Sequence, residues 1–238
     1  MKHSTRYSMY NDKTSKPTSL ELRGRRQLLK TAGALGLGVT GAFALGSLGV
    51  GPFMATPAHA APSLEDMLAP RVLGDPNAPI HMAEYFSLSC SHCANFHHGT
   101  FKQIKSDWID TGRVRFEMRD FPLQGPAIYA HALARSVPIT AYEGMIDILF
   151  KQQETWVTAD DPVSALARIA RIAGIGSDAF LEIVQNRPLL EGIVQIAQHG
   201  YSRYEINSTP SFVINDDNVI RGDAGYDDFL SALNEYST

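Results

Sequence analysis

Residues 84–93 read EYFSLSCSHC and contain both cysteines of the 238-residue chain, Cys90 and Cys93. The apolar run over residues 80–88 starts directly after a proline and predicts a strand. After the pair, large or β-branched side chains recur every four residues over 96–108, and this spacing predicts a helix. The two cysteines therefore lie where a strand leads into a helix.

This position bears on the chemistry of the pair. Cys90 precedes the first helical turn, where unpaired backbone N–H groups and the helix dipole stabilise a thiolate. Cysteines so placed in a Cys-X-X-Cys pair have pKa values of roughly 3.5 to 7.5 instead of about 8.5. Cys93 is close enough to close a small disulfide ring, and His92 between them is expected to stabilise the thiolate further. The pattern predicts a redox-active pair with Cys90 as the nucleophile.

Two other uses of the pair compete with a redox role. A disulfide that closes so short a loop restrains the unfolded chain little, so stabilisation is a weak reason for it. A structural zinc site would usually show a second Cys/His pair at a similar spacing, and none exists, although His97 and His98 could join Cys90 and Cys93. A periplasmic metal-binding chaperone or sensor is therefore the alternative class. The redox interpretation needs no metal and no cofactor beyond the Cys90–Cys93 disulfide.

The remaining sequence divides into strands at both ends and helices between them. Residues 114–121 alternate apolar and charged side chains and predict a half-buried strand, and residues 212–214 and 219–221 predict a hairpin. A last helix is expected over 226–235. Five helices are expected before the hairpin, over residues 127–136, 141–153, 163–173, 178–186 and 188–204. The predicted order is strand-helix-strand, a helical block, and strand-strand-helix, an α/β fold.

Three features together resemble the DsbA-type periplasmic disulfide oxidoreductases of the thioredoxin superfamily. They are the EYFS run before the pair, the CSHC pair itself, and STPSF at residues 208–212, which resembles the loop whose cis-proline faces the cysteines. The spacing of 117 residues from Cys93 to Pro210 (210 − 93) exceeds that of a minimal thioredoxin and matches the family's inserted helical domain. The resemblance implies a thioredoxin fold over residues 80–238 with a helical insertion at about 122–205.

The resemblance also implies roles for single residues. Cys90 matches the exposed nucleophile of the family, and Cys93 matches its buried partner. Pro210 matches the cis-proline, and Thr209 matches the preceding residue, whose backbone meets substrate. Glu84 matches a buried acid that passes protons, and a carboxyl in the strand below Cys93 is chemically suited to that role.

Two departures from the family pattern affect the expected direction of the reaction. Ser91 and His92 stand where the best-known members have Pro-His, so the redox potential is expected to be less extreme. Ser91 is a second expected substrate contact. Thr209 also occurs in isomerase branches.

The resemblance implies a dithiol oxidase that introduces disulfides into reduced exported proteins or peptides. A quinone-linked membrane oxidase of the DsbB type would re-oxidise it. A disulfide isomerase or a reductase of the same fold is the alternative within the enzyme class.

The first sixty residues are typical of an export signal. Arg25-Arg26 precedes a run over residues 31–58 that has no charged residue but seven glycines, and the run closes on Ala58-His59-Ala60. This predicts a twin-arginine (Tat) signal peptide over residues 1–60, cleaved after Ala60, and a periplasmic protein that meets the Tat translocase during export. An uncleaved anchor is the alternative, because this run could span a bilayer. Proline-rich residues 61–79 are expected to form an irregular N-terminal arm.

The net charge of −4 conceals two opposite parts. Residues 1–60 carry eight Lys and Arg against two Asp and Glu, whereas residues 61–238 carry 13 against 23. A body with a net charge of −10 (13 − 23) has no field that attracts phosphate backbones, so no nucleic-acid partner is expected. The hydrophobic content of 44% is that of an ordinary globular protein.

Overall fold

The computed structural model describes residues 62–123 and 125–237. The predicted signal peptide, its two arginines and its cleavage site lie outside these residues, so the expectations on export stay predictions. Within the described ranges, no helix is both long enough and apolar enough to cross a membrane.

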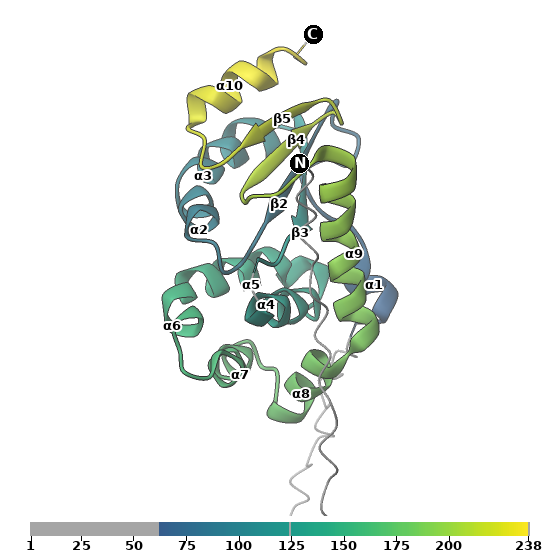
Figure 1. Cartoon of the computed structure of the whole chain (residues 1–238). Coiled ribbons are helices and arrows are strands. Elements are labelled where there is room, and N and C mark those ends of the chain that lie inside the picture. The colour runs from purple at the N-terminus through teal and green to yellow at the C-terminus, as the bar shows by residue number, and fades with distance from the viewer. Residues whose placement is uncertain (1–61, 124, 238) are drawn as a thin grey trace, which may run out of the picture. The chain divides into compact units, whose positions relative to one another are not determined.

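A five-stranded mixed sheet in the order β1-β3-β2-β4-β5 forms the centre of the fold (Figure 1). Its middle strand, β2 (Ile80–Phe86), is parallel to β3 (Val114–Asp120) and antiparallel to β4 (Ser211–Ile214). The predicted hairpin is confirmed, since β5 (Asn218–Arg221) pairs antiparallel with β4. Strands buried on both faces carry continuous apolar runs, which explains why the sequence of β2 does not alternate.

Helices cover both faces of this sheet (Figure 1). On one face, a Cβ at Gly200 would lie 2.4 Å from the Tyr85 ring, so only glycine lets the helix approach β2 this closely. On the other face, the ring of Phe212 lies 4.6 Å from that of Phe96 and 4.7 Å from that of Phe229, centroid to centroid. The helices concerned are α9 (Arg187–Tyr204) on the first face, and α2 (Ser91–His98), α3 (Thr100–Ile104) and α10 (Tyr226–Asn234) on the second.

A helical segment lies between β3 and β4, where the sequence predicts an insertion. Trp156 and Phe150 of this segment belong to the same hydrophobic core as Phe86 and Phe96, so the insertion and the sheet share one core. Besides α9, the segment contains α4 (Gly125–Arg135), α5 (Ile139–Lys151), α6 (Gln153–Val157), α7 (Pro162–Ile172) and α8 (Ser177–Gln185).

The single helix predicted over residues 96–108 is divided in the structure. α2 begins at Ser91, directly after Cys90 as predicted, and ends at His98, because the backbone of Gly99 leaves the helical region. After α3, residues Lys105–Ile109 form a π-helical turn, η1. Ile104 and Trp108 are buried in the core, so the apolar side chains keep their spacing of four residues across both breaks.

The prediction of an irregular arm over residues 61–79 is wrong at two places, where the chain forms a helix and a strand. α1 (Leu64–Leu68) starts with a capping box between Ser63 and Asp66, and β1 (Arg71–Leu73) pairs antiparallel with β3. Both elements are too short to show an apolar period. They are held by tertiary hydrogen bonds, since Arg135 of α4 donates to the carbonyl of Met67 at 2.8 Å.

Candidate active site

The two cysteines lie at the start of α2, at the end of the sheet where β2 finishes. Cys90 is the N-cap residue, with extended backbone, and its N–H donates to the Ser87 carbonyl at 3.0 Å. Its exposed fraction is 9%, whereas Cys93, one helical turn later, is fully buried. Both are in the thiol form in the structure. The predicted strand-to-helix junction is therefore confirmed, with one sulfur near the surface and one inside.

A loop from the far end of the chain completes the site. The Thr209–Pro210 peptide bond is cis, as the resemblance implies. The Cys90 thiol donates to the Thr209 carbonyl, with 3.3 Å between sulfur and oxygen. Thr209 and Pro210 are buried, while Ser91, the residue after Cys90, is exposed. The structure thus brings Cys90 together with the backbone predicted to meet substrate.

The two thiols have opposite acid strengths. Hydrogen bonding from the Cys93 thiol lowers the pKa of Cys90 to about 5; burial opposes this, and the backbone N–H groups of His92 and Cys93 support it. The pKa of Cys93 is raised far above its usual range, first by burial, then by its hydrogen bond to Cys90 and by the charge of Glu84. At neutral pH the pair therefore holds one thiolate, on Cys90, and one proton, on Cys93.

The side chain of His92 lies at the surface of the site. Its ring is mostly exposed, with 67% of the side chain accessible, and Nδ1 lies 3.6 Å from Oδ2 of Asp223 in the loop after β5. The residue influences the pKa of Cys90 through its backbone N–H. The expected contribution of its imidazolium to the Cys90 thiolate stays a prediction.

Glu84 lies under the pair on the face of β2 that α2 covers. Its side chain is fully buried, and Oε2 lies 2.9 Å from Nε2 of His97. The other oxygen, Oε1, has no hydrogen-bond partner among the described residues. Among residues 62–123 and 125–237, no group of three His, Cys, Asp or Glu side chains is arranged to hold a metal ion. His97, a ligand in the alternative interpretation, is engaged by Glu84 instead.

The inserted helices contact the active-site loop through a glutamine that sequence reasoning missed. Nε2 of Gln153, the first residue of α6, donates to the carbonyls of Leu88 at 2.7 Å and Cys90 at 3.0 Å. A glutamine at a helix start has many ordinary uses, so nothing in the sequence signals this contact. It fixes the backbone on both sides of Ser89.

A buried network of His131, Asp120 and Arg135 also binds the active-site loop, at Leu88. The Leu88 N–H donates to Nε2 of His131, whose Nδ1 lies 2.7 Å from Asp120 at the end of β3. Because Nε2 accepts, Nδ1 carries the proton and donates to the carboxylate. Arg135 also donates to Asp120. Burial alone would raise the pKa of Asp120, but Arg135 and His131 together lower it to about 2.

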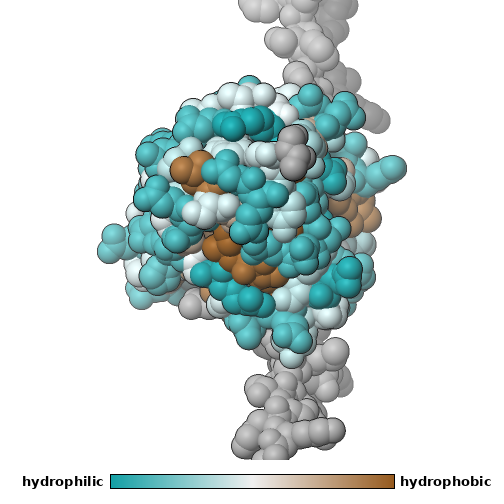
Figure 2. Space-filling model, turned by 90° about the horizontal axis from the view of Figure 1, so that it is seen from above, coloured by the Kyte–Doolittle hydropathy of each residue, from teal (hydrophilic) through white to brown (hydrophobic). Residues whose placement is uncertain are grey.

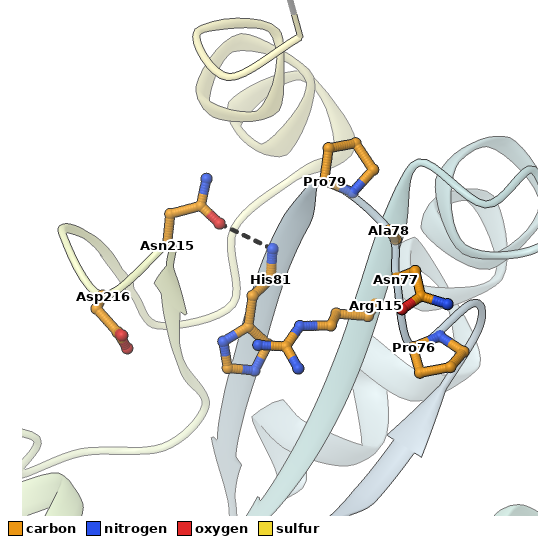
Figure 3. Close-up of a pocket in the computed structure, with 8 residues that line it drawn as sticks. All are labelled: Pro76, Asn77, Ala78, Pro79, His81, Arg115, Asn215 and Asp216. Carbon is orange, nitrogen blue, oxygen red and sulfur yellow. Dashed lines mark hydrogen bonds between the residues drawn. The ribbon is translucent and has the colours of Figure 1, made fainter.

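A separate pocket of about 400 Å³ opens at the opposite end of β2. His81 borders it, and its backbone N–H donates to Oδ1 of Asn215 at 2.8 Å (Figure 3). Since β2 starts here and the cysteines follow its other end, this pocket is not part of the thiol site.

The face shown in Figure 2 is mostly hydrophilic, with hydrophobic residues in a few separate patches.

Comparisons with known proteins agree with this geometry. A thioredoxin family model matches residues 67–235. The "Putative protein-disulfide oxidoreductase" of Rickettsia bellii is 28% identical over 145 residues, which cover 60% of this chain and 56% of that protein. The chain thus spans little more than half the length of that relative. Disulfide bond formation protein D of Bacillus subtilis is 25% identical over 170 residues, covering 68% and 74% of the two chains.

Solved structures give the same result for the fold. Wolbachia pipientis alpha-DsbA1 superimposes with a TM-score of 0.65 at 28% identity, over 71% of this chain and 91% of that one. BdbD from Bacillus subtilis has a TM-score of 0.63 at 22% identity, a likeness of fold alone. The predicted α/β thioredoxin fold with a helical insertion is confirmed. The chain belongs to the thioredoxin family, in the DsbA-like form that carries inserted helices between the strands of its sheet.

Proposed function

We propose that this protein is a periplasmic thiol–disulfide oxidoreductase that oxidises dithiols of exported proteins through Cys90 and Cys93. The observation that carries the proposal is the opposite acid strength of two sulfurs one helical turn apart. A thiolate at neutral pH is both a nucleophile and a good leaving group, whereas a buried thiol is neither. The names of the Rickettsia and Bacillus relatives support the same chemistry.

The reaction proceeds in two exchanges. A substrate thiolate attacks Sγ of Cys90 in the Cys90–Cys93 disulfide, and the electron pair of the broken S–S bond passes to Cys93, which takes up a proton. A second substrate thiolate then attacks the substrate sulfur of the mixed disulfide and releases Cys90 as a thiolate. The substrate gains a disulfide and the protein keeps two electrons. Thr209 and Ser91 are the proposed substrate contacts, and Pro210 shapes the loop that presents Thr209.

Oxidation is the direction that the site favours. Stabilising the Cys90 thiolate stabilises the reduced protein, and this makes the disulfide a stronger oxidant. A quinone-linked membrane protein of the DsbB type is the proposed electron acceptor, and reduced exported proteins or peptides are the proposed substrates. No metal or organic cofactor takes part. The predicted Tat signal peptide, cleaved after Ala60, supports the periplasmic location.

Two cysteine variants test the roles of the sulfurs. Cys90→Ser is expected to abolish oxidation of a reduced peptide, because the buried Cys93 cannot meet substrate. Cys93→Ser is expected to accumulate mixed disulfides on Cys90, detectable by mass spectrometry under non-reducing conditions. Adducts on Cys93 in the Cys90→Ser protein would show that the two roles are reversed.

A second experiment tests direction. The reduction potential is measured against glutathione, and both redox forms are unfolded in urea. The oxidised form is expected to be the less stable one, because the native fold favours the thiolate that only the reduced form contains. If the oxidised form is clearly more stable than the reduced form, the proposed oxidase activity is wrong and a reductase is favoured instead.

A further inference from the structure

A carboxylate lies on the rim of the thiol site. It belongs to Asp223, in the loop between β5 and α10. The N–H of the preceding Gly222 donates to the carbonyl of Pro210 at 2.9 Å, so the loop is fixed to the cis-proline. On its other side, Oδ2 of Asp223 lies 3.6 Å from Nδ1 of His92, two residues after Cys90. The loop therefore borders both segments that flank the reactive sulfur.

This carboxylate is available to bind a cation. The side chain of Asp223 is 33% exposed. Among the described residues, no lysine or arginine nitrogen lies within 4.0 Å of its oxygens, and the exposed His92 ring is its only basic neighbour. Two more acids, Asp227 and Asp228, follow in the first turn of α10 and add negative charge instead of balancing it. The rim thus presents negative charge beside a sulfur that must meet a peptide chain.

The net charge of the chain after the predicted signal peptide acts in the same sense. Residues 61–238 carry 13 Lys and Arg against 23 Asp and Glu, a net charge of −10 (13 − 23). A net charge of one sign attracts ligands of the opposite sign over about a Debye length, roughly 8 Å at physiological ionic strength. Cationic peptides are therefore attracted and anionic peptides repelled. This general field does not choose among side chains at the sulfur, whereas a carboxylate on the rim does.

We infer that Asp223 is a specificity-determining residue that selects substrates with a lysine or arginine beside the cysteine to be oxidised. A substrate that lies along the Thr209 backbone, with its sulfur on Cys90, carries its next residue toward the contact between Pro210 and Gly222. One residue of extended chain spans about 3.3 Å, and the long side chain of a lysine or arginine brings its cation to the carboxylate. The inference rests on the proposed exchange at Cys90 and names the substrate class of that site. Asp223 takes no part in the exchange of bonds.

Two peptides test the inference. Both contain the same reduced cysteine pair, and they differ only in the residue beside the first cysteine, which is arginine in one and glutamate in the other. Each peptide is mixed in excess with the oxidised protein, and opening of the Cys90–Cys93 disulfide is followed by acid quenching and alkylation. Varying the peptide concentration gives an apparent binding constant and a maximal rate. Dividing the arginine-to-glutamate ratio of a variant by that of the wild type cancels the intrinsic reactivity of the peptides.

Asp223→Asn removes the charge and keeps the shape of the side chain. An exposed ion pair changes an equilibrium constant by up to about fivefold, so the preference for the arginine peptide is expected to fall by about threefold to fivefold. The loss should lie in the apparent binding constant, with the maximal rate unchanged, because this side chain does not touch the reacting sulfurs. Asp223→Lys is expected to reverse the preference, so that the glutamate peptide binds more tightly.

Asp178→Asn is the matched control. Asp178 is an exposed acid in the first turn of α8, at the opposite end of the molecule from α10 (Figure 1), and its replacement changes the net charge by the same amount. This variant should keep the wild-type preference. An equal fall in both variants would show that the net charge alone selects substrates. An unchanged preference in Asp223→Asn would show that its carboxylate does not meet the substrate, and either result overturns the inference.

The wild-type protein provides a second measurement that needs no variant. Salt at 1 M shortens the Debye length to about 3 Å, so the preference for the arginine peptide is expected to shrink toward that of Asp223→Asn. A preference that salt does not change would come from packing and would overturn the inference. If neither peptide opens the disulfide, the proposed function itself fails. If both peptides open it equally well, that function stands and only the selection by charge is rejected.

Discussion

Cys90 and Cys93 have the same side chain, and only their positions on α2 separate their acid strengths. Cys90 stands before the first turn, where backbone N–H groups point at its sulfur. Cys93 stands inside the first turn, against β2 and the charge of Glu84. The sequence predicts the low pKa of Cys90, because its pattern shows that a strand leads into a helix at this residue. It does not predict that the His92 ring lies near Asp223, since that residue is 131 positions further on (223 − 92).

The pKa of Cys90 sets how the reduced protein responds to pH. Because its pKa of about 5 lies below the value of about 8.5 for an unfolded cysteine, thiolate formation stabilises the native reduced state. This contribution is complete above about pH 8.5 and is lost as the pH falls through 5. Alkylation of the native reduced protein by iodoacetamide is expected to follow a titration centred near pH 5 and to modify Cys90 alone. Modification of Cys93 at a similar rate would contradict the assigned burial.

Replacing the exposed imidazole is expected to change little. An exposed ion pair such as His92–Asp223 is worth up to about 1 kcal/mol, and one pKa unit corresponds to about 1.4 kcal/mol. His92→Ala should therefore move the alkylation midpoint of Cys90 by less than about one unit. Asp223→Asn serves as the matched control on the same pair. If the alkylation midpoint shifts by two pH units or more in His92→Ala but not in Asp223→Asn, the imidazolium is the main stabiliser of the thiolate.

Among the elements, those with a long apolar period or a clear turn were predictable from sequence. β2, β3, the hairpin and the inserted helices are of this kind. α1 and β1 were not predictable, because five and three residues are too few to show a period. The contacts of Gln153 and His131 with the active-site loop were not predictable either. They join segments about 40 to 65 residues apart in the chain, and local sequence patterns do not indicate contacts over such separations.

Gln153 is expected to stabilise the loop that holds Cys90. Gln153→Ala removes the donor to two carbonyls, and loss of a partner for a buried acceptor costs about 1–3 kcal/mol. The urea midpoint of the reduced protein should fall accordingly, and oxidation of a model peptide should slow because the loop is less well held. Gln152→Ala, the adjacent residue at the end of α5, is the control. Equal effects of the two changes would show that α6 as a whole, and not this contact, supports the loop.

The ionisation of Asp120 is expected to control how the stability of the fold falls at low pH. Its pKa falls from 3.8 to about 2 on folding, so its contribution of about 2 kcal/mol is present above pH 4 and is lost as the pH falls through 2. Asp120→Asn leaves buried Arg135 without its counter-charge, which costs about 3–5 kcal/mol. Urea midpoints between pH 2 and 6 should show a lower plateau and a weaker acid slope. Asp110→Asn, which removes an exposed partner of Lys105, is the control and should resemble wild type.

At the scale of the whole molecule, the export route is a prediction of the sequence alone. Replacing Arg25 and Arg26 by lysine is expected to retain the protein in the cytoplasm, because the Tat route requires the arginine pair. Wild-type protein recovered from the periplasm should begin at Ala61. Fractionation followed by N-terminal sequencing measures both outcomes. Continued export of the double variant would indicate the Sec route instead.

The pairing of β2 with β4 fixes when the site can first exist during synthesis. Tyr85 and Ser211 are partners in the sheet but lie 126 residues apart in the chain (211 − 85), and the inserted helices fill the interval. A ribosome delivers Cys90 long before it delivers Thr209, whose carbonyl meets the thiol. A nascent chain therefore carries both cysteines in an unfinished site while the 117 residues from Cys93 to Pro210 are made (210 − 93). Disulfides do not persist in a reducing cytoplasm, so on the predicted Tat route the pair is expected to become an oxidant only after export.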